Sequence, residues 1–174
     1  MVIFVDDILI YSKSEEVHEE HLRIVLETLR REKLYAKLSK CAFWLKSISF
    51  LGHIISEEGI SVDPEKIQAV KDWKAPKTVK GIKSFIGMAG YYKRFVQDFS
   101  KIATPLTKLT RKDEKFVWTE ECPAAFEELK KRLITAPVFK TPTGSGDMVI
   151  YNNTSKKGLG CVLTQHGHVI AYAS

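Results

Sequence analysis

The sequence predicts an α+β protein, with strands toward both ends of the chain and helices between them. Three observations predict this class. Two short apolar runs near the N-terminus flank a pair of aspartates, as expected for paired strands. Helix-capping signals and helical apolar spacing fill the middle of the chain. Strand-like runs return after residue 147, and 174 residues can bury one good core or two small ones.

The adjacent aspartates Asp6 and Asp7 interrupt an apolar run that covers 2–5 and 8–11. We expect two short buried strands with the carboxylates at the turn between them. Two like charges side by side are costly to bury unless cations neutralise them. Mg²⁺ takes carboxylate oxygens together with substrate phosphates, so the pair is a candidate metal site. The alternative is a polar hairpin turn, because acidic turns are common.

A helix is expected next, with apolar residues at helical spacing over 17–29. Its N-cap is either Ser12, paired with Glu15 in a capping box, or Ser14. Short strand-like pieces and a turn at 58–59 follow it. The strand-like pieces cover 36–38, 42–45 and 48–55.

Two further helices have clear start signals. Asp63 is an N-cap followed by Pro64 at the first helical position, and this helix runs to about Trp73. Thr78 caps a longer helix, which carries an apolar stripe as far as Val96.

The C-terminal half is predicted to contain a proline-containing stretch, a strand, a helix, a linker and an antiparallel meander. The residues after Asp147 form the meander, with a tight turn at His166-Gly167. Before the meander, the proline-containing stretch covers 103–106 and the strand covers 116–118. The helix covers 119–133, and the linker covers 136–146.

The formal net charge of +6 is unevenly distributed. Between Lys71 and Lys112 there are 11 Lys and Arg residues and only two acids, Asp72 and Asp98, which gives this block a charge of +9. Such a block on a modestly charged chain suggests a polyanionic partner. The alternative is a solvated basic face that binds nothing.

Cysteine usage and apolar run lengths bear on the compartment. Cys41, Cys122 and Cys161 are widely spaced, so we expect buried free thiols in a reducing, intracellular compartment. No apolar run approaches the roughly 20 residues of a membrane span. No basic segment precedes the first apolar run, so we expect neither a membrane partner nor secretion.

One face of the predicted 78–96 helix suits a nucleic-acid duplex. Lys83, Gly87 and Tyr91 follow one another at four-residue spacing, away from the apolar stripe. A cation, a bare backbone and an aromatic ring suit phosphate contact, close approach and van der Waals contact in a groove. Lys80 and Arg94 add positive charge nearby. Alternatively, Gly87 permits close helix packing and Tyr91 is half-buried.

In combination, these motifs resemble the pol polyprotein of gypsy-type LTR retrotransposons over nearly the whole chain. Residues 4–12 resemble the active-site hairpin of reverse transcriptase, which has an aromatic residue, any residue and two aspartates. A second segment resembles the primer grip: Phe50, Leu51, Gly52 and His53. Residues 63–67 and 85–95 resemble the thumb, whose helix lies along the minor groove. Residues 116–130 resemble the connection, and residues 151–174 resemble the opening of an RNase H-like domain.

The resemblance implies RNA-templated DNA synthesis by an RNA-directed DNA polymerase. Asp6 and Asp7 would hold a two-metal Mg²⁺ site, completed by a carboxylate outside this chain. The implied partners are an RNA–DNA hybrid or primer–template duplex, deoxynucleoside triphosphates in the full-length enzyme, and the rest of the polyprotein. The resemblance implies four parts. These are the palm at 1–60, the thumb at 61–112, the connection with its linker at 113–143, and the start of the RNase H-like domain at 144–174.

Two departures from the family pattern limit the expected activity. Because only the adjacent carboxylate pair is present, we expect a fragment that does not polymerise in isolation. Asn153 stands where the family's RNase H domain has a metal-binding aspartate, and a neutral amide cannot supply the charge that a Mg²⁺ pair requires. RNase H activity is therefore not expected. The alternative function is a non-enzymatic, nucleic-acid-binding remnant of a retroelement.

Overall fold

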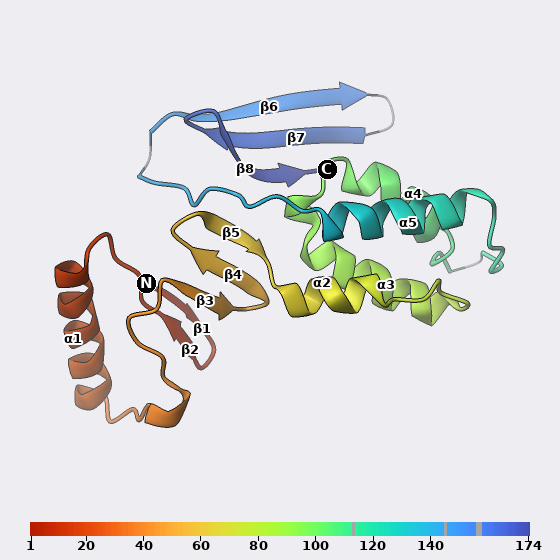
Figure 1. Cartoon of the computed structure of the whole chain (residues 1–174). Helices are drawn as coiled ribbons and strands as arrows, with labels where there is room; N and C mark the ends of the chain where they lie inside the picture. The colour runs from red at the N-terminus through yellow and green to blue at the C-terminus, as the bar shows by residue number, and fades with distance from the viewer. Residues whose placement is uncertain (113, 145, 156–157) are drawn as a thin grey trace. The chain divides into compact units, whose positions relative to one another are not determined.

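Figure 1 shows the computed structural model of the chain, which describes residues 1–112, 114–144, 146–155 and 158–174. The chain divides into two compact units, Met1–Lys46 and Ser47–Ser174. Strands and helices occur in both units, and the predicted α+β class is confirmed. None of the helices in these described ranges is long and apolar enough to cross a membrane.

The first unit begins with a small antiparallel hairpin. Strand β1 (Val2–Phe4) pairs with β2 (Asp7–Leu9), and Phe4 lies opposite Asp7. The predicted burial of these strands is wrong, because every residue of β1 is exposed and only Leu9 of β2 is buried. Two strands of three residues that pair only with each other leave both faces open.

A helix and a short 3₁₀ turn complete the first unit. Helix α1 (Glu15–Arg31) starts at Ser14, whose Oγ accepts a hydrogen bond from the N–H of Val17 at 3.4 Å. Ser14 is therefore the N-cap, rather than Ser12. The predicted strands at 36–38 and 42–45 are wrong: this stretch contains only the 3₁₀ helix η1 (Leu38–Lys40), because neither apolar run finds a strand to pair with.

The second unit opens with three antiparallel strands. The predicted 48–55 strand is in fact two strands, β3 (Ser47–Phe50) and β4 (His53–Ser56), and β5 (Gly59–Val62) follows. Leu51 and Gly52 form the turn between β3 and β4, with φ angles of 51° and 71°. Positive φ at both positions gives a tight turn that matches the strand twist.

Both predicted helix caps of the middle region are confirmed. Asp63 Oδ1 accepts a hydrogen bond from the N–H of Glu65 at 2.9 Å, and α2 (Pro64–Lys71) begins there. Thr78 Oγ1 accepts one from the N–H of Gly81 at 3.1 Å, which starts α3 (Val79–Tyr91). Helix α3 ends earlier than expected, and the 3₁₀ helix η2 (Lys93–Phe95) follows it.

Two helices complete the helical part. The proline-containing stretch lies inside α4 (Phe99–Lys108), and α5 (Glu121–Ile134) matches the predicted helix. Pro105 removes one helical hydrogen bond, but its neighbour Leu106 is fully buried in the core that α4 shares with α5. The predicted 116–118 strand is wrong, because its aromatic side chains pack against the core instead of pairing as a strand.

The segment 136–146 was expected to be a linker, and Ser145 within it lies outside the described residues. The described part of this segment is anchored to the second unit. Phe139 is 1% exposed and forms a two-bond bridge with Ile60, with N···O distances of 2.7 and 2.9 Å. Its ring stacks on Phe95, with centroids 5.0 Å apart, and meets Tyr172 edge-on. These contacts were missed because a single apolar residue produces no local pattern.

The predicted C-terminal meander is confirmed as three antiparallel strands, β6 (Met148–Ser155), β7 (Gly158–Gln165) and β8 (His168–Ala173). The predicted tight turn at His166-Gly167 is present, with φ angles of 50° and 77°. Strand β8 packs against η2. The backbone N–H and Oγ of Ser100 donate to Ser174, which fixes the end of the meander to the start of α4.

The three cysteines are free, but they differ in burial. Cys122 is buried in the helical core, as expected. Cys41 and Cys161 are partly exposed, so the prediction of burial is wrong for these two.

Candidate nucleic-acid interface

The aspartate pair lies at one end of the first unit's hairpin. Asp6 is in the turn and Asp7 is the first residue of β2, and both are exposed. The expectation that burial forces these carboxylates to be neutralised is therefore not met. Within the described ranges, no group of three His, Cys, Asp or Glu side chains could hold a metal ion. The pair can offer carboxylate oxygens to a cation but supplies only part of a site.

In the second unit, the turn between β3 and β4 is fastened to α3 at the carbonyl of Leu51. This oxygen accepts hydrogen bonds from the hydroxyl of Tyr91 and from Nδ1 of His53, each at 2.8 Å. Because a carbonyl can only accept, Nδ1 of His53 carries the proton. The tautomer of the imidazole is thereby set.

The neighbouring carbonyl of Gly52 is held in the same way. It accepts from the hydroxyl of Tyr92 at 3.0 Å and from the backbone N–H of Asp63 at 3.2 Å. Ser49 Oγ donates to the Asp63 carboxylate at 2.7 Å, and this bond and the α2 cap lower the pKa of Asp63. A Cβ on Gly52 would lie 2.6 Å from the Tyr92 hydroxyl, so only glycine fits here without a shift.

The His53 ring is enclosed by aromatic side chains. Its centroid lies 5.5 Å from that of Tyr91, 5.4 Å from Tyr92 and 5.8 Å from Phe95. Burial lowers the pKa of His53, the bond to Leu51 opposes this, and the charge of Arg94 lowers it further. Nε2 of His53 and Nε of Arg94 are buried with no hydrogen-bond partner among the described residues.

Acidification is expected to destabilise the second unit through His53. Above its unfolded-state pKa of about 6.5, the imidazole is neutral in both states and has no effect. As the pH falls below that value, the unfolded chain binds the proton first, so the free energy of unfolding decreases until the lower folded-state pKa is passed. His53→Phe should reduce the fall in thermal midpoint between pH 7 and pH 5. An unchanged fall in that variant would contradict this assignment.

The face of α3 predicted to meet a duplex is exposed. Lys80, Lys83, Gly87 and Tyr91 are all exposed, and Arg94 is partly buried with its guanidinium 5.6 Å from the ring centre of Phe95. A Cβ on Gly87 would meet nothing within 4 Å, and Tyr91 is 55% exposed. The alternative in which Gly87 serves helix packing is therefore wrong in the described structure, whereas Tyr91 is about half-buried, as that alternative expected.

The exposed face of α3 is brought together with the β3–β4 turn, since the Tyr91 hydroxyl bonds that turn directly. The predicted site residues at the turn are Phe50, Leu51, Gly52 and His53. Sequence reasoning missed Tyr92, and it missed that Asp63, besides capping α2, donates its backbone N–H to the Gly52 carbonyl. The only local signal was the adjacent tyrosine pair at the end of α3. Two consecutive helical residues point about 100° apart, so one tyrosine can be exposed while the other is buried.

Asn153 lies in β6 opposite Gly160 and is exposed. Its neighbours in the strand are an amide and a hydroxyl, Asn152 and Thr154. These side chains can offer neutral oxygens to a ligand, but no negative charge.

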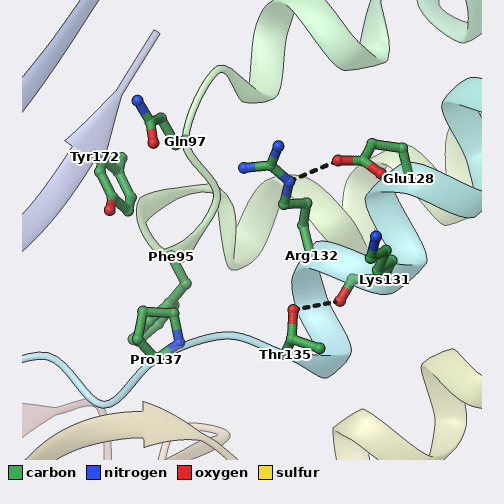
Figure 2. Close-up of a pocket in the computed structure, with 8 residues that line it drawn as sticks. All are labelled: Phe95, Gln97, Glu128, Lys131, Arg132, Thr135, Pro137 and Tyr172. Atoms are coloured by element: carbon green, nitrogen blue, oxygen red, sulfur yellow. Dashed lines mark hydrogen bonds and ion pairs between the residues drawn. The ribbon is translucent and has the colours of Figure 1, made fainter.

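A pocket of about 350 Å³ lies where η2, α5 and β8 meet, apart from the predicted site residues. The Arg132 guanidinium bonds Glu128 at 2.7 Å, and the Thr135 hydroxyl donates to the carbonyl of Lys131. Figure 2 shows both bonds as dashed lines. The bond to Arg132 lowers the pKa of Glu128. Lys131 also lines the pocket, so its charged side chains are two cations, Lys131 and Arg132, and one carboxylate, Glu128.

Two family models match parts of the chain. The model of reverse transcriptase (RNA-dependent DNA polymerase) matches residues 1–55. The model of the RNase H-like domain found in reverse transcriptase matches residues 118–174. The first match includes the aspartate pair, and the second includes α5 and the meander.

Curated relatives are parts of transposons. The chain is 34% identical to the retrovirus-related Pol polyprotein from transposon 297 of Drosophila melanogaster, over 99% of this chain and 16% of that protein. It is 34% identical to the transposon Tf2-3 polyprotein of Schizosaccharomyces pombe, over 95% and 12%. It is 33% identical to the Pol polyprotein from transposon opus of Drosophila melanogaster, over 94% and 17%. The chain thus spans less than a fifth of the length of these relatives.

Solved structures of foamy viral protease-reverse transcriptase are also similar. The complex of its dRH form with double-stranded DNA matches with a TM-score of 0.82 and 26% identity, over 94% of this chain and 30% of that chain. The complex with an RNA/DNA hybrid matches with a TM-score of 0.79 and 25% identity, over 94% and 23%.

Proposed function

Because this chain belongs to the Pol polyproteins of retrotransposons, in the segment that runs from reverse transcriptase into an RNase H-like domain, we propose that it acts in RNA-templated DNA synthesis. The observation that carries the proposal is the Asp6-Asp7 pair in a hairpin inside the residues matched by the reverse transcriptase model. Besides a primer–template duplex, the proposed partners are deoxynucleoside triphosphates and the rest of the polyprotein.

The proposed role of Asp6 and Asp7 is to hold Mg²⁺ through their carboxylate oxygens. Both side chains are exposed, which fits a cation shared with substrate phosphates and further ligands. When bound, the metal pair supplies charge neutralisation for in-line phosphoryl transfer. Since the described residues provide no third ligand beside the pair, we propose that the isolated chain does not extend a primer.

The proposed binding surface for primer–template combines the β3–β4 turn with the exposed face of α3. The turn contributes Phe50 to His53, and α3 with its flank contributes Lys80, Lys83, Gly87, Tyr91 and Arg94. The open space at Gly87 supports close approach of a sugar–phosphate backbone, and the lysines suit phosphate contacts. Such a surface would read the shape and charge of a hybrid rather than its base sequence.

The remaining assignments are proposals for the polyprotein segment. We propose palm, thumb, connection and RNase H-like parts with the boundaries 1–60, 61–112, 113–143 and 144–174; Asp113, at one boundary, lies outside the described residues. Asn153 supports the absence of RNase H cleavage by this chain. The three free cysteines support a reducing intracellular compartment.

Fluorescence anisotropy with a labelled RNA–DNA primer–template across a salt series tests the proposed surface. Lys83→Gln should reduce the slope of log K against log salt by about 0.9, the contribution of one phosphate contact. Lys13→Gln, which removes one charge outside the basic block, should leave the slope unchanged. Equal slopes for wild type and Lys83→Gln would contradict a phosphate contact by Lys83.

Two more variants separate the enzyme from a binding remnant. Gly87→Ala should weaken binding several-fold, because a methyl group would intrude on the groove contact. Asp6→Ala should weaken the Mg²⁺-dependent part of binding and leave the Mg²⁺-independent part unchanged. If Mg²⁺ does not alter binding by the wild type, only the non-enzymatic alternative is left. No other observation on the described residues favours that alternative.

A further inference from the structure

We infer that Tyr91 and Tyr92 are positioning residues that fix the β3–β4 turn to α3, so that turn and helix meet a duplex as one rigid surface. This inference rests on the proposed function and deepens it. It adds a role for two hydroxyl groups that neither the motifs nor the relatives assign.

The hydrogen bonding of the turn carries the inference. Each of its two carbonyl oxygens, on Leu51 and Gly52, accepts two hydrogen bonds, which uses the full accepting capacity of a carbonyl. One bond of each pair comes from a nearer part of the chain, from His53 at the start of β4 or from Asp63, the cap of α2. The other comes from a tyrosine hydroxyl 40 residues later in the chain. The tyrosines tie the turn to α3.

The backbone of the turn is strained in a way that needs such support. Leu51 has a φ angle of 51°, a conformation that residues with a branched side chain rarely adopt. Strained residues persist where their surroundings over-determine them, and they cluster at ligand-contacting positions. The four hydrogen bonds supply that over-determination at Leu51 and Gly52.

The Tyr92 hydroxyl is a permanent donor. Burial, the neighbouring Tyr91 and the charge of Asp63 raise the pKa of Tyr92 to about 12. Its proton therefore stays in the bond to Gly52 at any physiological pH. The residue as a whole is 3% exposed, so it is not available for contact with a duplex and acts only through the turn.

Tyr91 links the turn to the charged face directly. It shares its helix face with Lys83 and Gly87, and its hydroxyl bonds the Leu51 carbonyl. Together with the bond from Tyr92 to Gly52, this bond sets the distance between the helix face and the turn. A duplex that contacts both would meet a preformed spacing, which avoids the cost of ordering the turn upon binding.

The test removes the hydroxyls and keeps the rings. Tyr91→Phe, Tyr92→Phe and the double variant are compared with wild type in the 174-residue chain, with Tyr151→Phe as control, because Tyr151 is an exposed tyrosine on β6. Amide hydrogen exchange over residues 50–53 without nucleic acid reports whether the turn is held. Affinity for the RNA–DNA primer–template is measured where circular dichroism shows each variant fully folded.

We expect exchange over 50–53 to rise about fivefold for each single variant, as the loss of one net hydrogen bond predicts, and to be unchanged in the control. Affinity should fall by a similar factor with the salt slope unchanged, since no charge is removed. Wild-type exchange in the double variant would overturn the inference at the turn. Faster exchange with wild-type affinity would overturn the link to binding. A wild type that binds no primer–template would refute the proposed function instead, while the exchange result still decides whether the hydroxyls hold the turn.

Discussion

Phe139→Ala should lower the free energy of unfolding of the second unit by about 3–5 kcal/mol, the cost typical of truncating a buried phenylalanine. The ring is 1% exposed and lies between Phe95 and Tyr172. Its removal leaves a cavity lined by aromatic side chains that cannot collapse without moving η2 or β8. Urea denaturation measures the change.

The adjacent Val138 provides the control, because its side chain is 48% exposed. Val138→Ala should change the free energy of unfolding by no more than about 0.5 kcal/mol, as for other surface substitutions. A loss below about 1 kcal/mol for Phe139→Ala would place this residue among loosely packed positions. The segment would then be the linker that its composition predicts.

Gly59→Ala is expected to have the second largest effect, a loss of about 3 kcal/mol or more, from backbone strain and the loss of two hydrogen bonds. Gly59 has a φ angle of 138°, and its Cβ would lie 2.0 Å from the carbonyl oxygen of Phe139. Neither partner can yield as a flexible side chain would, since the clash is with backbone. The bridge between Ile60 and Phe139 should break.

Gly87→Ala is the matched control, with the opposite expected sign. This glycine lies inside α3 with nothing within 4 Å of a Cβ, so alanine should stabilise the helix by about 1 kcal/mol. Thermal denaturation of the two variants measures both effects. Similar shifts in the two variants would show that the bridge at Gly59 carries no special constraint.

The success of sequence reasoning depended on how local each signal was. Asp63 and Thr78 were predicted as caps because a cap is a contact between residues two or three apart. The helix around Pro105 was not predicted, since proline is locally unfavourable inside a helix. The burial of Leu106 and Ala103, which decides the outcome, comes from α5.

The candidate site divides in the same way. The shared face of Lys83, Gly87 and Tyr91 follows from helical spacing alone, and their exposure agrees with it. The turn at Leu51-Gly52 was missed because Leu51 lacks the asparagine or glycine that usually marks such a turn. The bonds from the tyrosines to that turn depend on tertiary packing, so no pattern in the sequence contains them.

The exposed β1–β2 hairpin has a consequence for how the chain unfolds. Of the first unit's hairpin and helix, only Leu9 is buried, whereas the second unit has a continuous aromatic and aliphatic core. Local opening costs little where few apolar contacts must be broken. We therefore expect the hairpin that carries Asp6 and Asp7 to open more often than the core of the second unit.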